Sequence, residues 1–158
     1  MNSHRVDALG WQIQEDDMVT KTGSAKWQGN IREGKGEVST QSGVLSNQPY
    51  SFATRFEDKA GTNPEELIGA AHAACYSMAL SGGLAAAGVT DVTIETTSAI
   101  SMDKDPAGGF AITKAALTVR ITAKGDRAAI EQAARDAEAG CPVSKLMKAE
   151  ITLDLTIV

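Results

Sequence analysis

One stretch, TNPEELIGAAHAACYSMALSGGLAAAG at residues 62–88, constrains the fold more than any other part of the chain. The pattern predicts one long helix that Thr62 or Asn63 caps and Pro64 begins. Glu65 lies in the first turn, where the positive helix end favours a carboxylate. The body is rich in Ala, Leu, Met and Gly, so the helix is apolar on nearly every side and needs cover from a large core or from another chain. A chain of 158 residues supplies that cover with difficulty, which favours a homodimer in which two such helices pack together.

Length and composition set the broad class. The chain is 42% hydrophobic and 22% charged, which is typical of one soluble globular domain with its own core. The net charge of −5 speaks against nucleic acid and anionic membrane surfaces as partners, because both bind basic proteins. Residues 67–87 come nearest to a membrane span, but Gly, Ser, His and many Ala residues dilute them. We therefore expect no nucleic-acid partner and no membrane partner.

The first 17 residues, MNSHRVDALGWQIQEDD, are polar and lack a clear period. They fit an appended strand, a disordered tail or a translated leader upstream of Met18. We therefore expect an N-terminal extension over residues 1–17 and a single domain over residues 18–158. The segment lacks the apolar core and the cleavage site of a secretory signal, which predicts a cytoplasmic protein.

The content of cysteine and histidine limits the chemistry. Two cysteines in a reducing compartment more often serve chemistry than structure. Cys75 and Cys141 lie too far apart in the sequence for a thioredoxin-like C-x-x-C pair. The two histidines, His4 and His72, are too few for a closed zinc site. We expect neither a metal nor an organic cofactor.

Alternating β-branched segments and turn residues predict the rest of the fold. Three short strands come first, as hairpins or a small antiparallel meander, and two longer strands joined by KDPAGG follow the long helix. A second helix begins at Asp126 and ends at Gly140, and a short third helix begins at Pro142 and leads into a last strand. The order β-β-β-α-β-β-α-α-β predicts an α+β fold in which antiparallel sheets accompany a long central helix. The expected strands are SAKWQGNI, GKGEVSTQSG, QPYSFATRF, VTIETTSAISMD, FAITKAALTVRITA and EITLDLTIV.

Each cysteine has an unreactive and a reactive interpretation. Cys75, in the middle of the long helix, is either a small buried hydrophobic residue or a nucleophile. Cys141 stands between Gly140 and Pro142, where a helix begins, so unpaired backbone N–H groups and the positive helix end favour its thiolate. His72 precedes Cys75 by about one helical turn. It either forms a nucleophile–base pair with Cys75 or hydrogen-bonds to backbone or water.

Two long motifs, NPEELIGAAHAAC and AGCPVSK, strongly resemble the OsmC branch of the OsmC/Ohr family. The runs GKGEVSTQSGVLSNQPYSFATRF and GFAITKAAL belong to the same resemblance, which covers Thr20–Val158. Members of this branch are osmotically inducible thiol peroxidases related to the organic hydroperoxide resistance proteins. The resemblance implies an intertwined α+β homodimer with two cysteine-based peroxidase sites at the subunit interface. It also implies organic hydroperoxides as substrates, with hydrogen peroxide a poorer one.

Carried over residue by residue, the resemblance implies four catalytic residues. Cys75 attacks the peroxide, and Cys141 converts the resulting sulfenic acid to a disulfide. Arg55 corresponds to the arginine of the TRF run, which OsmC-like proteins carry on this later strand and Ohr proteins carry on an earlier loop. Glu65 corresponds to the glutamate that follows NP. A dithiol reductant, of the lipoyl type by resemblance, then reduces the disulfide.

The four residues make chemical sense together. A guanidinium near Cys75 favours the thiolate and can hold the leaving oxygen, while the carboxylate of Glu65 offsets the desolvation of Arg55 and fixes its direction. Glu65 and Cys75 are ten residues apart on one predicted helix, hence about 15 Å apart along its axis. One arginine hardly reaches both within one chain, so we expect Glu65 to complete the active site of the neighbouring subunit. The apolar lining expected for organic hydroperoxides comprises Phe52, Met78, Leu146 and Met147. The alternative for each of these residues is that it belongs to the plain hydrophobic core.

Two other functions fit the same residues. A thiol-based redox sensor or general disulfide exchanger would use both cysteines without peroxidase turnover. A non-catalytic module would bind apolar ligands at the dimer interface and would tolerate Cys75→Ser. Catalytic consumption of peroxide in the presence of a dithiol separates the enzyme from both.

Overall fold

The structure is a computed structural model and describes residues 19–158. These residues form two compact units, one that ends at Leu67 and one that comprises Ile68–Val158. The predicted N-terminal extension, residues 1–17, lies outside the described residues. The assignment of residues 18–158 to a single domain stays a prediction.

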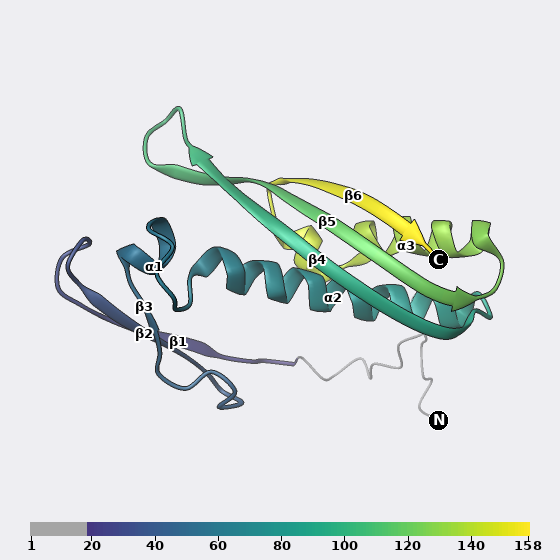
Figure 1. The fold of residues 1–158 in the computed structure, drawn as a ribbon, viewed down its shortest axis with the longest axis horizontal. Helices are drawn as coiled ribbons and strands as arrows, with labels where there is room; N and C mark the ends of the chain where they lie inside the picture. The colour runs from purple at the N-terminus through teal and green to yellow at the C-terminus, as the bar shows by residue number, and fades with distance from the viewer. Residues whose placement is uncertain (1–18) are drawn as a thin grey trace, which may run out of the picture. The chain divides into compact units, whose positions relative to one another are not determined.

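The unit that ends at Leu67 contains a three-stranded antiparallel sheet in the order β1-β2-β3 (Figure 1). Gly36 lies opposite both Trp27 and Tyr50 in this sheet, and the two aromatic rings lie 5.3 Å apart between centroids. A side chain at Gly36 would collide with the Tyr50 ring, so glycine is what lets the aromatic pair lie across the strand. The predicted meander is confirmed, with the strands β1 (Gly23–Gln28), β2 (Lys35–Thr40) and β3 (Gln48–Tyr50).

The chain leaves β3 through a short helix, α1 (Phe52–Phe56), where the sequence predicted that the strand continues. Ser51 Oγ accepts a hydrogen bond from the Thr54 N–H, and the Ser51 N–H donates to Thr54 Oγ1. This reciprocal capping box satisfies two backbone donors and starts a helix at the point where the strand ends. The prediction that Arg55 lies on a strand is therefore wrong, because it lies in the last turn of α1.

The long helix is α2 (Pro64–Ala86), as predicted. Asn63 provides its cap, since Asn63 Oδ1 accepts a hydrogen bond of 2.8 Å from the Glu66 N–H. Beyond Leu67, the described residues cover one face of α2, and Met78 remains 59% exposed. The fully buried residues on that face recur every four positions and are His72, Tyr76, Leu80 and Leu84.

Among the described residues, α2 is the one helix that is long and apolar enough to cross a membrane by length and composition alone. Its fully buried residues include His72, and Tyr76 donates a hydrogen bond to a backbone carbonyl. Such a row of buried side chains is typical of the core helix of a folded domain.

The unit Ile68–Val158 is built on a sheet in the order β4-β5-β6, with α3 and the part of α2 beyond Leu67 on one face (Figure 1). Antiparallel pairing predominates in the two sheets, as predicted, but β6 runs parallel to β5. Two helices fill the connection from β5 to β6, which is the kind of crossover that parallel neighbours require. The elements are β4 (Thr90–Lys104), β5 (Phe110–Lys124), α3 (Arg127–Gly140), α4 (Pro142–Leu146) and β6 (Glu150–Ile157).

The hydrophobic core of this unit lies between the sheet and the helices α2 and α3. The Tyr76 hydroxyl donates to the carbonyl oxygen of Ala134 at 3.1 Å, so α2 and α3 are joined by a buried polar contact as well. Asp126 caps α3, as predicted, by accepting from the Ala129 N–H. The fold is α+β, as predicted. Its buried apolar centre includes Leu80, Leu84, Leu117, Val119, Ile121, Ile130, Ala134 and Ala137.

Candidate active site

The structure brings the two cysteines together. Cys75 lies in the middle of α2, and Cys141 lies at the junction where α3 ends and α4 begins. Their sulfur atoms are 2.9 Å apart, and both residues are free thiols. Cys141 is fully buried, whereas Cys75 is partly exposed. Of the two residues, Cys75 is therefore the more accessible to an external reagent.

Burial raises the pKa of the Cys75 thiol, and the contact with Cys141 acts in the same direction. A second ionisable thiol beside Cys75 disfavours a negative charge on the Cys75 sulfur. A backbone hydrogen bond from Val143, in the first turn of α4, lowers the pKa of Cys75 but does not reverse the shift. The sequence predicted that the start of a helix favours the thiolate of Cys141. In the structure, the α4 backbone hydrogen-bonds to Cys75 instead. The surroundings of Cys75 within the unit Ile68–Val158 therefore favour the neutral thiol.

His72 does not act as a base for Cys75 in this structure. Its Nδ1 lies 2.8 Å from Ser98 Oγ on β4, and its Nε2 lies 2.9 Å from Ser144 Oγ on α4. Both ring nitrogens thus contact serine hydroxyls. The hypothesis that His72 is not a base predicted hydrogen bonds to backbone or water instead. The ring is fully buried, and this burial lowers the pKa of His72.

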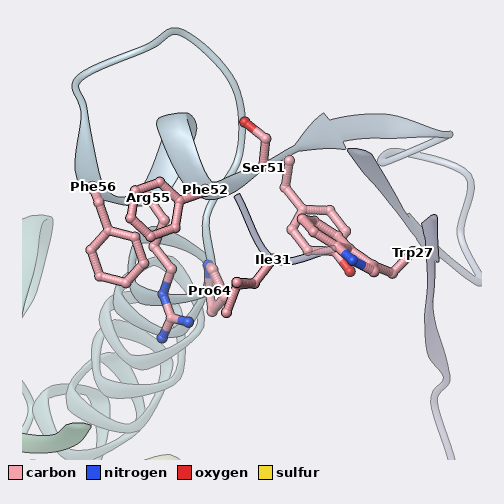
Figure 2. A pocket seen from close by; sticks show the side chains of 8 residues that line it. Trp27, Ile31, Ser51, Phe52, Arg55, Phe56 and Pro64 are labelled. Carbon is pink, nitrogen blue, oxygen red and sulfur yellow. The ribbon is translucent and has the colours of Figure 1, made fainter. Parts of the chain in front are cut away.

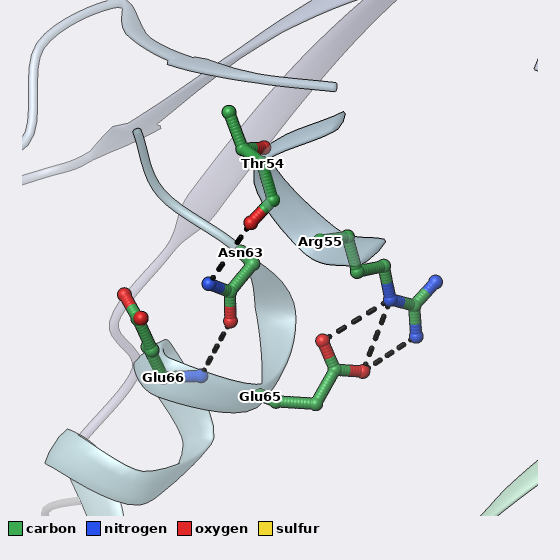
Figure 3. A network of polar contacts seen from close by, with 5 residues as sticks. All are labelled: Thr54, Arg55, Asn63, Glu65 and Glu66. Carbon is green, nitrogen blue, oxygen red and sulfur yellow. Dashed lines mark hydrogen bonds and ion pairs between the residues drawn. The ribbon is translucent and has the colours of Figure 1, made fainter. Parts of the chain in front are cut away.

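Arg55 and Glu65 form a two-pronged ion pair within the unit that ends at Leu67 (Figure 3). Arg55 Nη2 donates to Glu65 Oε1 at 2.6 Å, and Arg55 Nε lies 3.1 Å from each carboxylate oxygen. The carboxylate side chain is 16% exposed and the guanidinium side chain 36%. Asn63 joins the two helices here, because it caps α2 and its Nδ2 donates to the Thr54 carbonyl oxygen of α1. The guanidinium is thus held in a defined direction.

This ion pair refines the expected role of Glu65. The sequence argument paired Arg55 with Glu65 and assigned Glu65 to the site of the neighbouring subunit. In the structure the two residues belong to one chain and one unit. If Glu65 serves a neighbouring subunit, Arg55 therefore accompanies it.

An apolar pocket of about 300 Å³ adjoins the guanidinium of Arg55 (Figure 2). Of the four residues predicted as apolar lining, Phe52 belongs to this pocket, while Met78 and Leu146 are 59% and 79% exposed. The other aromatic members escaped the sequence reasoning. A signal was available in the sequence. Aromatic residues make up only 4% of the chain, yet Tyr50, Phe52 and Phe56 follow one another closely. The lining comprises Trp27, Ile31, Tyr50, Ser51, Phe52, Arg55, Phe56 and Pro64.

Within residues 19–158, no group of three or more His, Cys, Asp or Glu side chains is arranged to hold a metal ion. The chemically distinctive groups of this part of the chain are the two thiols and the Arg55–Glu65 ion pair.

Comparisons with known proteins identify relatives of this chain. The model of the OsmC-like protein family matches residues 56–156. The chain is 58% identical over 137 residues to Peroxiredoxin OsmC of Escherichia coli (strain K12), a match that covers 86% of the chain and 95% of that relative. It is 29% identical over 124 residues to the organic hydroperoxide resistance protein OhrB of Bacillus subtilis (strain 168), covering 77% of the chain and 88% of OhrB.

Solved structures show the same fold. The crystal structure of Bacillus subtilis OhrB matches with a TM-score of 0.60 at 26% identity, covering 87% of this chain and 98% of that one. A Legionella pneumophila organic hydroperoxide resistance protein OsmC matches with a TM-score of 0.61 at 25% identity, covering 90% and 98%. The fold and the paired thiols thus define a protein of the OsmC/Ohr class. More particularly, the chain belongs to the OsmC-like protein family.

Proposed function

We propose that this chain is a cysteine-based peroxidase that reduces organic hydroperoxides through Cys75 and Cys141. The observation that carries the proposal is the contact of 2.9 Å between the two sulfur atoms, one partly exposed and one buried. The peroxiredoxin class of activity is supported by the 58% identity to a relative named Peroxiredoxin OsmC. The organic substrate is supported by the likeness to OhrB, whose name refers to organic hydroperoxides.

The proposed reaction has two chemical steps before reduction. The Cys75 thiolate attacks one oxygen of the hydroperoxide, the O–O bond breaks, and the other oxygen leaves as an alkoxide that takes a proton to become an alcohol. Cys75 is then a sulfenic acid. The Cys141 sulfur attacks the Cys75 sulfur, a disulfide forms, and water leaves. The separation of 2.9 Å lets this second step proceed with little movement of either helix.

Activation of Cys75 calls for a positive charge beside its sulfur. Burial and the second thiol raise the pKa of Cys75, so the thiolate needs a cation to be populated at neutral pH. Arg55 is the proposed cation, and Glu65 holds the guanidinium in place. The guanidinium would stabilise both the thiolate and the leaving oxygen.

We further propose that each active site draws on two subunits of a homodimer. Glu65 and Cys75 are ten residues apart on α2, which corresponds to about 15 Å along the helix axis. Because Arg55 is bound to Glu65 of its own chain, the proposal assigns this ion pair to the Cys75 of the neighbouring subunit. The exposed apolar residues Met78 and Leu146 would be covered in such a dimer.

The apolar pocket beside Arg55 supports organic hydroperoxides over hydrogen peroxide. Its volume of about 300 Å³ suits a small organic group, and its aromatic and aliphatic walls offer little to a molecule as polar as hydrogen peroxide. A hydroperoxide whose organic group occupies this pocket would present its O–O bond to the guanidinium. The reductant is proposed to be a dithiol of the lipoyl type, acting in the cytoplasm on the Cys75–Cys141 disulfide.

Steady-state peroxide consumption tests the proposal. We expect faster turnover with cumyl or tert-butyl hydroperoxide than with hydrogen peroxide, and faster turnover with a lipoyl dithiol than with thioredoxin as reductant. A protein that is oxidised once by peroxide and does not turn over with any dithiol would be a redox sensor, and the peroxidase proposal would fail. Binding of apolar ligands that is unaffected by Cys75→Ser, without peroxide consumption, would instead support a non-catalytic module.

A further inference from the structure

Two side-chain contacts, one helical turn apart, join α2 to α4. Cys75 contacts Cys141 at 2.9 Å, and His72 Nε2 contacts Ser144 Oγ at 2.9 Å. On α2, His72 precedes Cys75 by three residues, and at the start of α4, Ser144 follows Cys141 by three residues. Residues three apart on a helix lie on the same face, so the two contacts are adjacent. In the proposed reaction the two sulfur atoms react, whereas the His72–Ser144 contact contains no reacting atom.

The His72 contact is anchored on its far side. His72 Nδ1 lies 2.8 Å from Ser98 Oγ, so the ring connects β4, α2 and α4. The ring is fully buried, and its lowered pKa keeps it neutral. A neutral imidazole has one donor and one acceptor, so one serine hydroxyl donates to the ring and the other accepts from it. Each bond is buried or partly buried, where losing a partner is costly.

The helix α4 needs such an anchor. It has five residues, too few for a helix to be stable by itself, and its N-cap residue Cys141 makes no side-chain capping bond. Leu146 at its end is 79% exposed, so that residue contributes little packing. Ser144 is the buried residue of α4, and its hydroxyl is bonded to His72.

We propose that His72 is a positioning residue that holds Cys141 against Cys75 through its hydrogen bond to Ser144. The sulfur contact changes its covalent state at every step of the proposed reaction, whereas the His72–Ser144 bond takes part in none of them. It therefore keeps α4 in place while Cys75 is a sulfenic acid, and it raises the effective concentration of the Cys141 thiol at the Cys75 sulfur. The role of the bond while Cys75 is a sulfenic acid rests on the proposed function, but the positioning of Cys141 by the His72–Ser144 bond does not.

Oxidised glutathione measures the positioning without any peroxide. The Cys75 thiolate attacks one sulfur of glutathione disulfide, a mixed disulfide forms, and glutathione thiolate leaves. The Cys141 thiol, losing its proton, then attacks the Cys75 sulfur, the protein disulfide forms, and a second glutathione leaves. The ratio of protein disulfide to mixed disulfide at a fixed glutathione concentration gives the effective concentration of Cys141.

Ser144→Ala and Ser98→Ala form a matched pair, because each removes one serine hydroxyl from the same imidazole. We expect Ser144→Ala to lower the effective concentration of Cys141 by about tenfold or more, and Ser98→Ala to change it less than about threefold. The rate at which Cys75 forms the mixed disulfide should be the same in both variants. Equal losses in the two variants, or no loss in Ser144→Ala, would overturn the inference.

Substitutions of the ring itself provide a second test, which decides the question if Ser144→Ala does not fold by circular dichroism. A Gln side chain places its amide near the position of Nε2, and an Asn side chain places its amide near Nδ1. His72→Gln keeps the bond to Ser144 and should retain most of the effective concentration, whereas His72→Asn keeps the bond to Ser98 and should lose it. The reverse order would contradict the positioning role.

The same variants separate this inference from the peroxidase proposal. With cumyl hydroperoxide, Ser144→Ala should form the Cys75 sulfenic acid at the wild-type rate and convert it to the disulfide about tenfold more slowly. Over-oxidation to sulfinic acid should rise accordingly. If the wild-type chain forms no sulfenic acid at all, the peroxidase proposal fails while the glutathione ratios still test the positioning.

Discussion

At the scale of single residues, the two cysteines differ in access. Cys75 is partly exposed and Cys141 is fully buried, although their sulfurs are 2.9 Å apart. Cys75 is therefore the more accessible of the two to a hydroperoxide. This difference in exposure supports the proposed roles, in which Cys75 attacks the peroxide and Cys141 forms the disulfide.

Replacement of each cysteine should separate these roles. Cys75→Ser should abolish peroxide consumption, because the hydroxyl of serine is a far weaker nucleophile than a thiolate. Cys141→Ser should still reduce one equivalent of peroxide as Cys75 becomes a sulfenic acid, and further peroxide should then over-oxidise Cys75. Single-turnover peroxide assays with mass spectrometry of the protein measure both results. A Cys141→Ser variant that is inactive at the first turnover, beside an active Cys75→Ser variant, would reverse the assignment.

The pH dependence of Cys75 alkylation should show whether the Arg55 guanidinium stabilises the thiolate. Burial raises the pKa of Cys75, and a nearby cation opposes this shift by stabilising the thiolate. The thiolate fraction grows as pH rises, so alkylation of Cys75 should accelerate through its pKa. Arg55→Met should move the midpoint of this profile to higher pH, in a Cys141→Ser background that leaves one cysteine.

Arg120→Met is the matched control for this profile. Arg120 lies on β5, paired with Glu95 at the surface, and is 59% exposed. Its removal takes away one positive charge at a site that the account does not connect with Cys75. Equal shifts of the alkylation midpoint in Arg55→Met and Arg120→Met would show that Arg55 has no specific contact with the thiolate.

At the scale of elements, the sequence predicted those whose signals are local. The helices α2 and α3 carry clear caps at Asn63 and Asp126, α4 has Pro142 at its first position, and each helix begins where it was expected. The helix α1 was missed because five residues are too few to show a helical period, and a capping box at Ser51 decides its conformation. The parallel pairing of β6 depends on where the α3–α4 crossover packs, which no local pattern encodes.

In the candidate active site, too, the sequence predicted the features that have local signals and missed those that depend on packing. Sequence motifs identified the cysteines and the Arg55–Glu65 candidates, but spacing along the chain says nothing of the contact between Cys75 and Cys141. That contact depends on how α4 packs against α2. The direction of the His72 ring was equally unpredictable, because its partners Ser98 and Ser144 come from two other elements.

Two helix caps give a matched test of α1. Ser51→Ala and Asp126→Ala each remove an N-cap side chain and should each lower the free energy of unfolding by about 1 kcal/mol. Only Ser51→Ala should also lower peroxidase turnover, because α1 carries Arg55. Urea denaturation and steady-state assays measure the two effects. Equal turnover in both variants would mean that the position of α1 does not matter for catalysis.

At the scale of the whole molecule, the account requires a dimer. One face of α2 is covered within the chain beyond Leu67, and Met78 on that helix remains 59% exposed. The proposed second subunit would cover this apolar surface and bring an Arg55–Glu65 pair to each Cys75. The dimer and its shared active sites are therefore a single proposal.

Mixing two inactive variants tests that proposal. Cys75→Ser lacks the nucleophile and Arg55→Met lacks the cation, so neither homodimer should turn over. After unfolding and refolding together, mixed dimers should contain one complete site, and the mixture should recover about a quarter of the wild-type activity. No recovery, although mixed dimers form as judged by native mass spectrometry, would place the whole site within one chain.

The most direct test of the central claim is to treat the reduced protein with one equivalent of cumyl hydroperoxide and map its cysteines by mass spectrometry. The account predicts one cumyl alcohol per chain and a disulfide that links the Cys75 and Cys141 peptides. Unreacted hydroperoxide, or a chain in which Cys75 is oxidised while Cys141 remains a free thiol, would contradict it.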